Sequence, residues 1–196
     1  MAINREQYQK IYERLNQVEV LDQDCGSLCG HACCHFDNDY LPEIVNPDFF
    51  NDNPDDEMVI LLFPGEEELQ KENGWLEVFS EDAEELNYPP QWQKVYFARC
   101  KGNKHCQRAS RPIQCRTFPL WPHLADEQLY LIYYPEQLPY KCPLIERRLR
   151  LRDDFLQETY AAWQELLEDE VIRELVLEDS LDRDYRQLHY QIVYSE

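Results

Sequence analysis

Four cysteines lie within ten positions near the start of the chain, in the segment DCGSLCGHACCHF (residues 24–36). A tetrahedral thiolate site takes four ligands, so the eight cysteines of the chain would fill two such sites or one multi-metal cluster. Nearby glycines and prolines let short segments bend until several sulfurs meet at one ion. We therefore predict that all eight are metal ligands: Cys25, Cys29, Cys33, Cys34, Cys100, Cys106, Cys115 and Cys142.

The spacing of the first group sets a condition on its backbone. Cys25, Cys29 and Cys33 recur every four residues. On a continuous helix they would share one face but spread along about 12 Å of the axis, which is too far for one ion. A shared metal therefore requires a non-helical turn. Because Cys34 directly follows Cys33, we expect their side chains to diverge and to reach one ion each. A redox-active pair is less favoured, since a disulfide between neighbours is strained.

Histidines and basic residues accompany the cysteines. His31, His35 and His105 could ligate a metal or hydrogen-bond to the thiolates, whereas His123 and His189 are typical of ordinary core or surface positions. Several thiolates around one ion leave excess negative charge, which nearby bases would offset. Alternatively, these bases pair with surplus acids. The bases lie within sixteen residues of one another, and the two that flank Cys115 are the better candidates: Lys101, Lys104, Arg108, Arg111 and Arg116.

The composition limits the classes of partner. The chain has 196 residues, which suits one domain, and its formal net charge is −20, from 39 acidic and 19 basic residues. Because a chain with this much negative charge repels phosphate backbones and anionic membranes, we expect neither nucleic-acid nor membrane binding. The charge is typical of a solvated surface, or of an acidic patch for a basic protein partner. The oligomeric state is left open.

Cysteine usage depends on the cellular compartment. The start of the chain, MAINREQYQKIYERL, has no apolar leader segment, and the longest apolar run, MVILLF (58–63), is too short to cross a bilayer. We therefore expect a cytoplasmic protein. Disulfides rarely persist in the cytosol, so metal binding or catalysis explains eight cysteines better than cystine does. Burial of cysteines as small hydrophobic side chains is a further alternative.

The apolar patterns predict an α+β fold. It would consist of a small, mostly antiparallel sheet with helices at both ends and a cysteine-rich, metal-stabilised loop region. We expect helices over 4–20, over 64–74 and from residue 146 onward, strands over 58–63, 75–80, 94–100 and 128–134, and irregular chain over 37–57 and 101–124.

The last helical segment has an apolar stripe that is typical of core packing. We expect a break between two helices near 178–180. The stripe consists of Leu149, Leu156, Tyr160, Trp163, Leu167 and Val171. The chain would then form a single domain, 1–196, with a cysteine-cluster metal-binding core over 25–142 and a helical C-terminal extension over 143–196.

The segments CGSLCGHACC and CKGNKHCQRASRPIQCRTFPL together resemble the YkgJ-type cysteine-cluster family, whose domain is described as zinc- or iron-chelating. That family opens with a C-x3-C-x2-C-C type motif and continues with two more cysteines and an Arg-Pro-x-x-Cys-Arg-x-Phe-Pro-like stretch, here residues 111–119. Cys142 matches a final downstream cysteine. This chain departs from the pattern because three residues, not two, separate Cys29 from Cys33. The resemblance covers 25–142 only.

The resemblance implies a metal-binding protein in which thiolates chelate zinc or iron, in one or two sites that stabilise the fold. The cysteine motif is also similar to that of the flagellin lysine N-methylase group, which is linked to an iron–sulfur centre and S-adenosylmethionine chemistry. This implies an alternative: an iron–sulfur enzyme or redox protein of the protein-lysine methylation type. The chain contains no glycine-rich loop between a strand and a helix, no nucleophile elbow and no His-Glu-x-x-His motif. Whether it is an enzyme is therefore left open.

Overall fold

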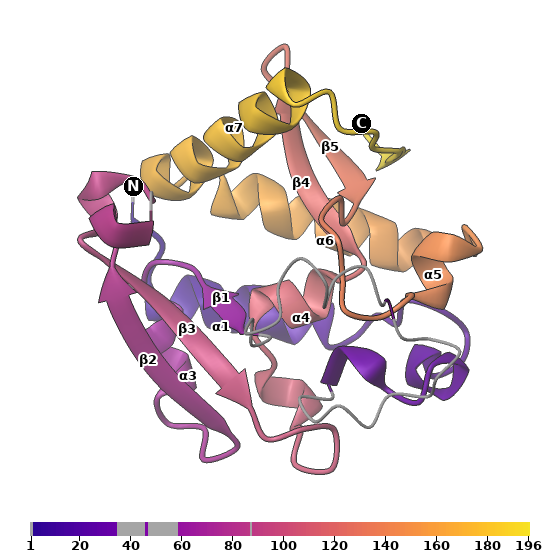
Figure 1. Ribbon diagram of the computed structural model, residues 1–196. Coiled ribbons are helices and arrows are strands. Elements are labelled where there is room, and N and C mark those ends of the chain that lie inside the picture. Colours follow the sequence, from indigo (N-terminus) through magenta and orange to yellow (C-terminus); the bar gives the residue numbers. More distant parts are fainter. Residues whose placement is uncertain (1, 35–45, 47–58, 87) are drawn as a thin grey trace.

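The computed structural model describes residues 2–34, 46, 59–86 and 88–196 (Figure 1). The irregular chain expected over 37–57, except residue 46, lies outside the described residues. His35 and the first residue of the strand expected over 58–63 also lie outside them. None of the described helices combines the length and the apolarity that a membrane-spanning helix needs.

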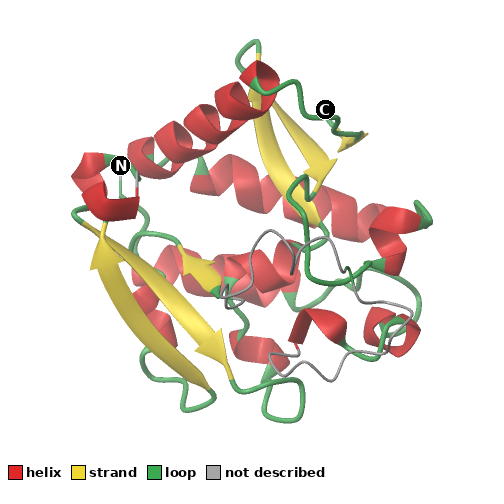
Figure 2. Cartoon of the chain, viewed as in Figure 1, coloured by secondary structure: helices red, strands yellow, loops and turns green. Residues whose placement is uncertain are grey.

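Short helices and strands alternate along most of the chain, and the two longest helices come late (Figure 2). The α-helices are α1 (Arg5–Leu15), α3 (Glu67–Gln70), α4 (Ile113–Thr117), α5 (Pro143–Glu146), α6 (Asp153–Leu166) and α7 (Glu170–Tyr185). The strands are β1 (Ile60–Leu62), β2 (Leu76–Asp82), β3 (Lys94–Cys100), β4 (Leu120–Ala125), β5 (Gln128–Tyr133) and β6 (Ile192–Tyr194). The 3-10 turns are η1 (Cys25–Leu28), η2 (Ala32–Cys34), η3 (Glu84–Leu86), η4 (Pro90–Trp92) and η5 (Arg108–Ser110).

The strands form two antiparallel sheets, each with three strands. The first has the order β1-β3-β2, and its register places Leu76 opposite Cys100 at the end of β3. The second has the order β4-β5-β6 and pairs Trp121 with Ile132. The turn between β4 and β5 consists of Asp126 and Glu127, both with positive φ, which suits the twist of a tight hairpin.

Helix α1 begins at a capping box and packs by one face. The Asn4 side chain accepts a hydrogen bond from the backbone N–H of Gln7, and the Gln7 side chain accepts one from the backbone N–H of Asn4. Its apolar face is buried and consists of Tyr8, Ile11, Tyr12 and Leu15. The helix contacts α6, so the first and the last thirds of the chain share one core.

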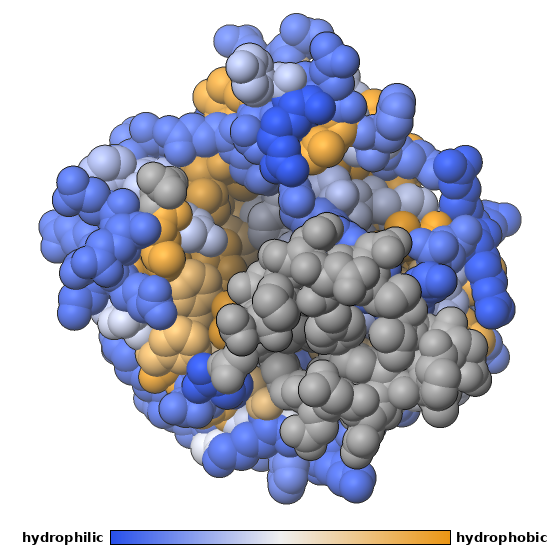
Figure 3. Space-filling model, viewed as in Figure 1, coloured by the Kyte–Doolittle hydropathy of each residue, from blue (hydrophilic) through white to orange (hydrophobic). Residues whose placement is uncertain are grey.

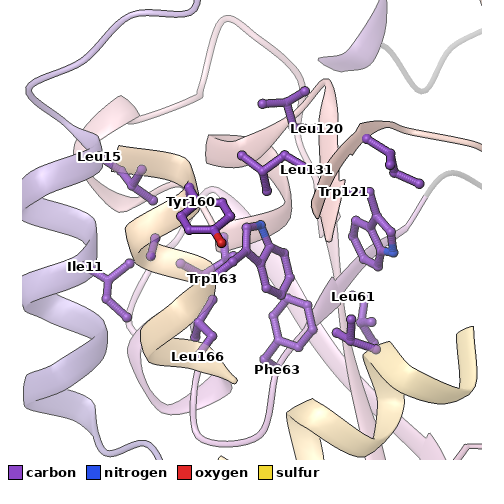
Figure 4. Packing of buried hydrophobic residues seen from close by; sticks show 14 of the residues in the cluster. Ile11, Leu15, Leu61, Phe63, Leu120, Trp121, Leu131, Tyr160, Trp163 and Leu166 are labelled. Atoms are coloured by element: carbon purple, nitrogen blue, oxygen red, sulfur yellow. The ribbon is translucent and has the colours of Figure 1, made fainter. Parts of the chain in front are cut away.

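The centre of the core is a cluster of aromatic side chains that joins both sheets. Trp163 of α6 is fully buried, and its ring centroid lies 5.4 Å from that of Phe63 and 5.8 Å from that of Trp121. Phe63 directly follows β1, and Trp121 belongs to β4. Figure 4 shows Trp163 packed against Phe63 in this core. The two sheets are therefore held together through one helix.

The fold confirms the predicted α+β class and differs from the prediction in several details. The helices expected over 4–20 and 64–74 are shorter, Arg5–Leu15 and Glu67–Gln70, and the helical region expected from residue 146 contains a non-helical stretch over 147–152. The strands of the described residues form two small sheets instead of one. Residues 101–124 are not irregular throughout, because α4 and β4 fall there, and β4 pairs along its whole length with β5. The break between the last two helices lies at 167–169, not at 178–180. Leu167 is the C-cap of the first helix, and the Asp169 side chain caps the second by accepting hydrogen bonds from the N–H groups of Val171 and Ile172. Strand β6 follows the second helix.

Candidate metal centre

The first cysteine group lies on two 3-10 turns joined by a left-handed corner. Asp24 caps η1, with its Oδ1 accepting from the N–H of Gly26 at 3.2 Å. Gly30 and His31 both have positive φ, which turns the chain between η1 and η2. A Cβ on Gly26 would lie 2.3 Å from Cδ2 of His31, so only glycine fits beneath that ring. The backbone is thus non-helical overall, as a shared metal would require.

The second group follows the end of β3. Cys100 is the last residue of that strand, and its sulfur accepts from the N–H of Gly102 at 3.3 Å. Gly102 has a φ of +91°, and a Cβ there would lie 3.4 Å from the carbonyl oxygen of Cys34. The turn after β3 therefore packs against η2. Helix α4 then carries Cys115, and its first turn follows Pro112, whose fixed φ suits that position.

A cavity of about 270 Å³ lies between these segments. Its walls combine five cysteines with aromatic and polar side chains: Cys33, Cys34, Cys100, Cys106, Cys115, Trp75, Arg111, Gln114, Phe118, Tyr134 and Tyr140. A second cavity shares Val59, Gln114 and Tyr134 with it and extends toward Phe97 and Trp121. Figure 3 shows apolar residues around a hollow beside the β1-β3-β2 sheet.

The electrostatic environment of the thiols shows which cysteines are neighbours. Burial raises the pKa of Cys115, and the thiols of Cys34, Cys100 and Cys106 raise it further, whereas Arg111 lowers it. We call these four residues the cavity-side group. They come from three separate segments, which the fold brings together.

A second set of neighbours lies at the start of α5. Cys142 caps that helix and is buried. Burial raises the pKa of its thiol to about 11; the N–H groups of Ile145 and Leu144 oppose this shift, and the thiols of Cys29 and Cys25 add to it. We call Cys25, Cys29 and Cys142 the α5-side group.

Cys33 lies between the two groups. A hydrogen bond with Cys34 raises the pKa of its thiol, and the thiols of Cys34, Cys115 and Cys29 raise it further, although the residue itself is exposed. The sulfurs of Cys33 and Cys34 are 3.9 Å apart, so the two side chains do not diverge as expected.

Arg111 is the base that reaches a sulfur. Its Nε donates to Sγ of Cys106 at 3.0 Å. Arg116 instead joins α1 to α4: its guanidinium donates to the carbonyl oxygen of Tyr12 at 3.2 Å and lies 4.0 Å from the centroid of that ring. Burial lowers the pKa of Arg116 to about 10. Arg108 pairs with Glu19 at 2.9 Å, as the alternative reading of the basic residues predicted.

The histidines are less involved. Nε2 of His31 lies 3.1 Å from Oδ2 of Asp24, which fixes the ring over Gly26. His105 and His189 are exposed. His123 is buried in the second sheet with its ring centroid 4.4 Å from that of Tyr190, and burial, together with Arg183, lowers its pKa. His123 and His189 are thus a core and a surface residue, as expected.

All eight cysteines are described, and none of them forms a disulfide. Within the described ranges, however, no three or more His, Cys, Asp or Glu side chains are placed so that they could hold a metal ion. The fold brings the cysteines into two neighbouring groups without closing a ligand set. Metal ligation by these residues therefore stays a prediction.

One residue important for this region was missed by the sequence patterns. Glu66 is fully buried, and its carboxylate accepts from the N–H of Ile113 at 2.6 Å, from the N–H of Phe63 at 3.0 Å and from the hydroxyl of Tyr12. It thereby anchors the start of α4, the helix that carries Cys115. The sequence showed Glu66 only as one of several acids at the start of a short helix.

Comparisons with known proteins identify no relative of this chain. The chain matches no protein-family model, no curated protein and no solved structure. The resemblance to the YkgJ-type family therefore stays a prediction that depends on the cysteine and arginine motifs.

Proposed function

We propose that this chain is a metal-binding protein whose cysteine thiolates hold zinc or iron in two neighbouring centres that stabilise the fold. The observation that carries the proposal is the gathering of eight cysteines, none in a disulfide, from separate segments into two adjacent groups, with Arg111 donating to one of the sulfurs. Packing alone does not explain so many cysteines, because only three of the eight are buried and an aliphatic side chain would fill the same space.

The cavity-side group supplies four ligands to the first centre: Cys34, Cys100, Cys106 and Cys115. The α5-side group supplies three to the second, and Cys33, which neighbours both groups, is its fourth. Bound metal would crosslink η1, η2, the end of β3, α4 and the start of α5. For a metal ion to bind, the cysteine sulfurs of each group must move closer together, since the described side chains do not form a ligand set.

The donor chemistry fits a thiophilic metal. Zinc and iron both accept four thiolates. Burial raises the pKa of several of these thiols, so metal must displace their protons, and Arg111 offsets part of the resulting negative charge. The proposal places the protein in the cytoplasm, where cysteines stay reduced.

Metal analysis tests the two centres separately. We expect about two metal ions per chain in protein prepared without oxygen. Cys115→Ser should remove mainly the ion of the cavity-side group, and Cys142→Ser mainly that of the α5-side group. Ser110→Ala, which changes the same loop but no thiol, should leave the metal content unchanged. A wild-type chain without metal, or with its sulfurs joined pairwise as cystine, would contradict the proposal.

An iron–sulfur cluster is the second candidate, and the cavity favours it. A volume of about 270 Å³ beside five thiols exceeds what one ion needs. Four cysteines suffice to hold an iron–sulfur cluster. The rest of the cavity would admit a second reactant beside the cluster. The chain would then be a redox protein or an enzyme. The resemblance suggests protein-lysine methylation. Brown protein with visible absorption would favour this candidate, and colourless protein with zinc would favour a structural role.

The bond from Arg111 to Cys106 predicts a further effect on metal binding. Replacing Arg111 with Gln removes the cation beside the thiolates, so we expect metal affinity to fall by about 10- to 100-fold in a competition titration with a chromophoric chelator. Arg108→Gln is the matched control, because Arg108 pairs with Glu19 instead, and it should change the affinity less than about twofold. Equal losses in the two variants would mean that only the general charge of the loop matters.

A further inference from the structure

The outward side of α7 carries an apolar strip far along the chain from the cysteines. Among the described residues, five large hydrophobic side chains are exposed, and three of them lie on this one helix. Leu177, Leu181 and Tyr185 are 42%, 58% and 88% exposed. Their spacing of four residues places them in one row about 12 Å long. The opposite side of α7 is buried through Ile172 and Val176 and packs against β4, so the strip is not part of the core.

A row of acids runs beside this strip. It repeats with the same spacing of four residues: Glu170, Glu174, Glu178 and Asp182. The whole helix has six acidic and two basic residues, and one of the bases, Arg183, is buried and paired with Asp179. Figure 1 shows α7 at the outer edge of the molecule, above α6. Asp182, at the end of the acidic row, pairs with Arg186 at 3.1 Å, so the negative border of the apolar row consists mainly of Glu170, Glu174 and Glu178.

We propose that this strip of α7 binds a basic amphipathic helix of another protein. The apolar row matches the apolar face of such a helix, and the acids match lysines or arginines at its edges, as in paired helices. A second copy of this chain fits poorly, because two molecules of net charge −20 would bring two acidic rows together. An anionic membrane is disfavoured for the same reason.

The test uses a labelled eighteen-residue helical peptide with leucines on one face and lysines on its borders, at about 0.15 M salt. Fluorescence anisotropy should show saturable binding to the metal-loaded full chain, and a peptide with glutamates in place of the lysines should not bind. The triple change Leu177→Ala, Leu181→Ala and Tyr185→Ala should weaken binding at least about tenfold. Ile192→Ala, a half-exposed apolar residue outside α7, should leave it unchanged.

A pair of charge variants separates the acidic row from general charge. Glu170→Gln with Glu178→Gln should weaken binding about three- to tenfold and reduce its salt dependence. Glu81→Gln with Asp82→Asn removes the same charge from exposed positions in β2 and should have less than a twofold effect. Equal losses in the two pairs, or wild-type affinity in the triple variant, would overturn the proposal. Binding to zwitterionic lipid vesicles that is lost in the triple variant would also overturn it, since the strip would then be a lipid contact.

Discussion

Removing the metal should cost the protein most of its stability. A structural zinc site contributes on the order of 10 kcal/mol of apparent folding free energy, and a domain has only about 5–15 kcal/mol in total. Most of the cysteines lie on short 3-10 turns, in a loop or on one five-residue helix, which cannot stabilise themselves. We therefore expect a strong chelator to lower the melting temperature by more than about 10 °C.

The loss should be local at first. Trp163, Phe63 and Trp121 pack against one another and need no metal for that contact, so the core around α6 should persist when the metal leaves. Hydrogen exchange should accelerate over 24–34 and 100–118 before it accelerates over 153–166. Adding zinc or iron back should restore both the melting temperature and the protection. Identical melting and exchange with and without chelator would show that the cysteines do not hold a stabilising metal.

Glu66→Gln should be the most damaging change away from the cysteines. All three groups that face the Glu66 carboxylate are donors: the hydroxyl of Tyr12 and the N–H groups of Phe63 and Ile113. A glutamine turns an amide NH2 toward at least one of them, and a buried donor without an acceptor costs about 1–3 kcal/mol. We expect a loss of about 3 kcal/mol in the free energy of unfolding. Glu68→Gln, an exposed change in the same helix, should stay within about 0.5 kcal/mol of wild type.

The same residue predicts a pH dependence. Burial raises the pKa of Glu66 from 4.5 to about 7, against the hydrogen bonds that lower it. Between these values the native state binds more protons than the unfolded state, so the contribution of Glu66 to stability is fully present below pH 4.5 and falls as the pH rises to 7. The difference amounts to about 3 kcal/mol.

Denaturant unfolding of the metal-loaded protein at pH 5, 6 and 7.5 measures this effect. Wild type should lose stability across that interval relative to Glu66→Gln, which has no group to titrate there. The gap between the two proteins should therefore be larger at pH 5 than at pH 7.5. A constant gap would mean that Glu66 is ionised throughout this pH interval and would contradict the prediction.

Local patterns in the sequence determined much of the secondary structure. The face of α1 and the strands β2, β3 and β5 follow from periods of 3.6 and 2 within single segments, because side chains on one face of an element repeat with its geometry. Strand β4 was missed because prolines in 112–122 indicate irregular chain, whereas pairing with β5 and burial of Trp121 decide it. The break between the last two helices was predicted too late in the chain, because a serine such as Ser180 often ends a helix. Here Ser180 lies within α7, and its buried hydroxyl donates a hydrogen bond to the carbonyl oxygen of Val176.

The sequence by itself determined which residues are candidate metal ligands, because the residue type alone identifies the eight cysteines whose thiolates could bind zinc or iron. Only the tertiary structure decided how they are grouped. Cys34 joins Cys115 because the turn at Gly102 packs on η2, and Cys142 joins Cys29 because α5 returns to η1. The physical reason is that a ligand set depends on distances between segments a hundred residues apart, which core packing sets and no local period encodes.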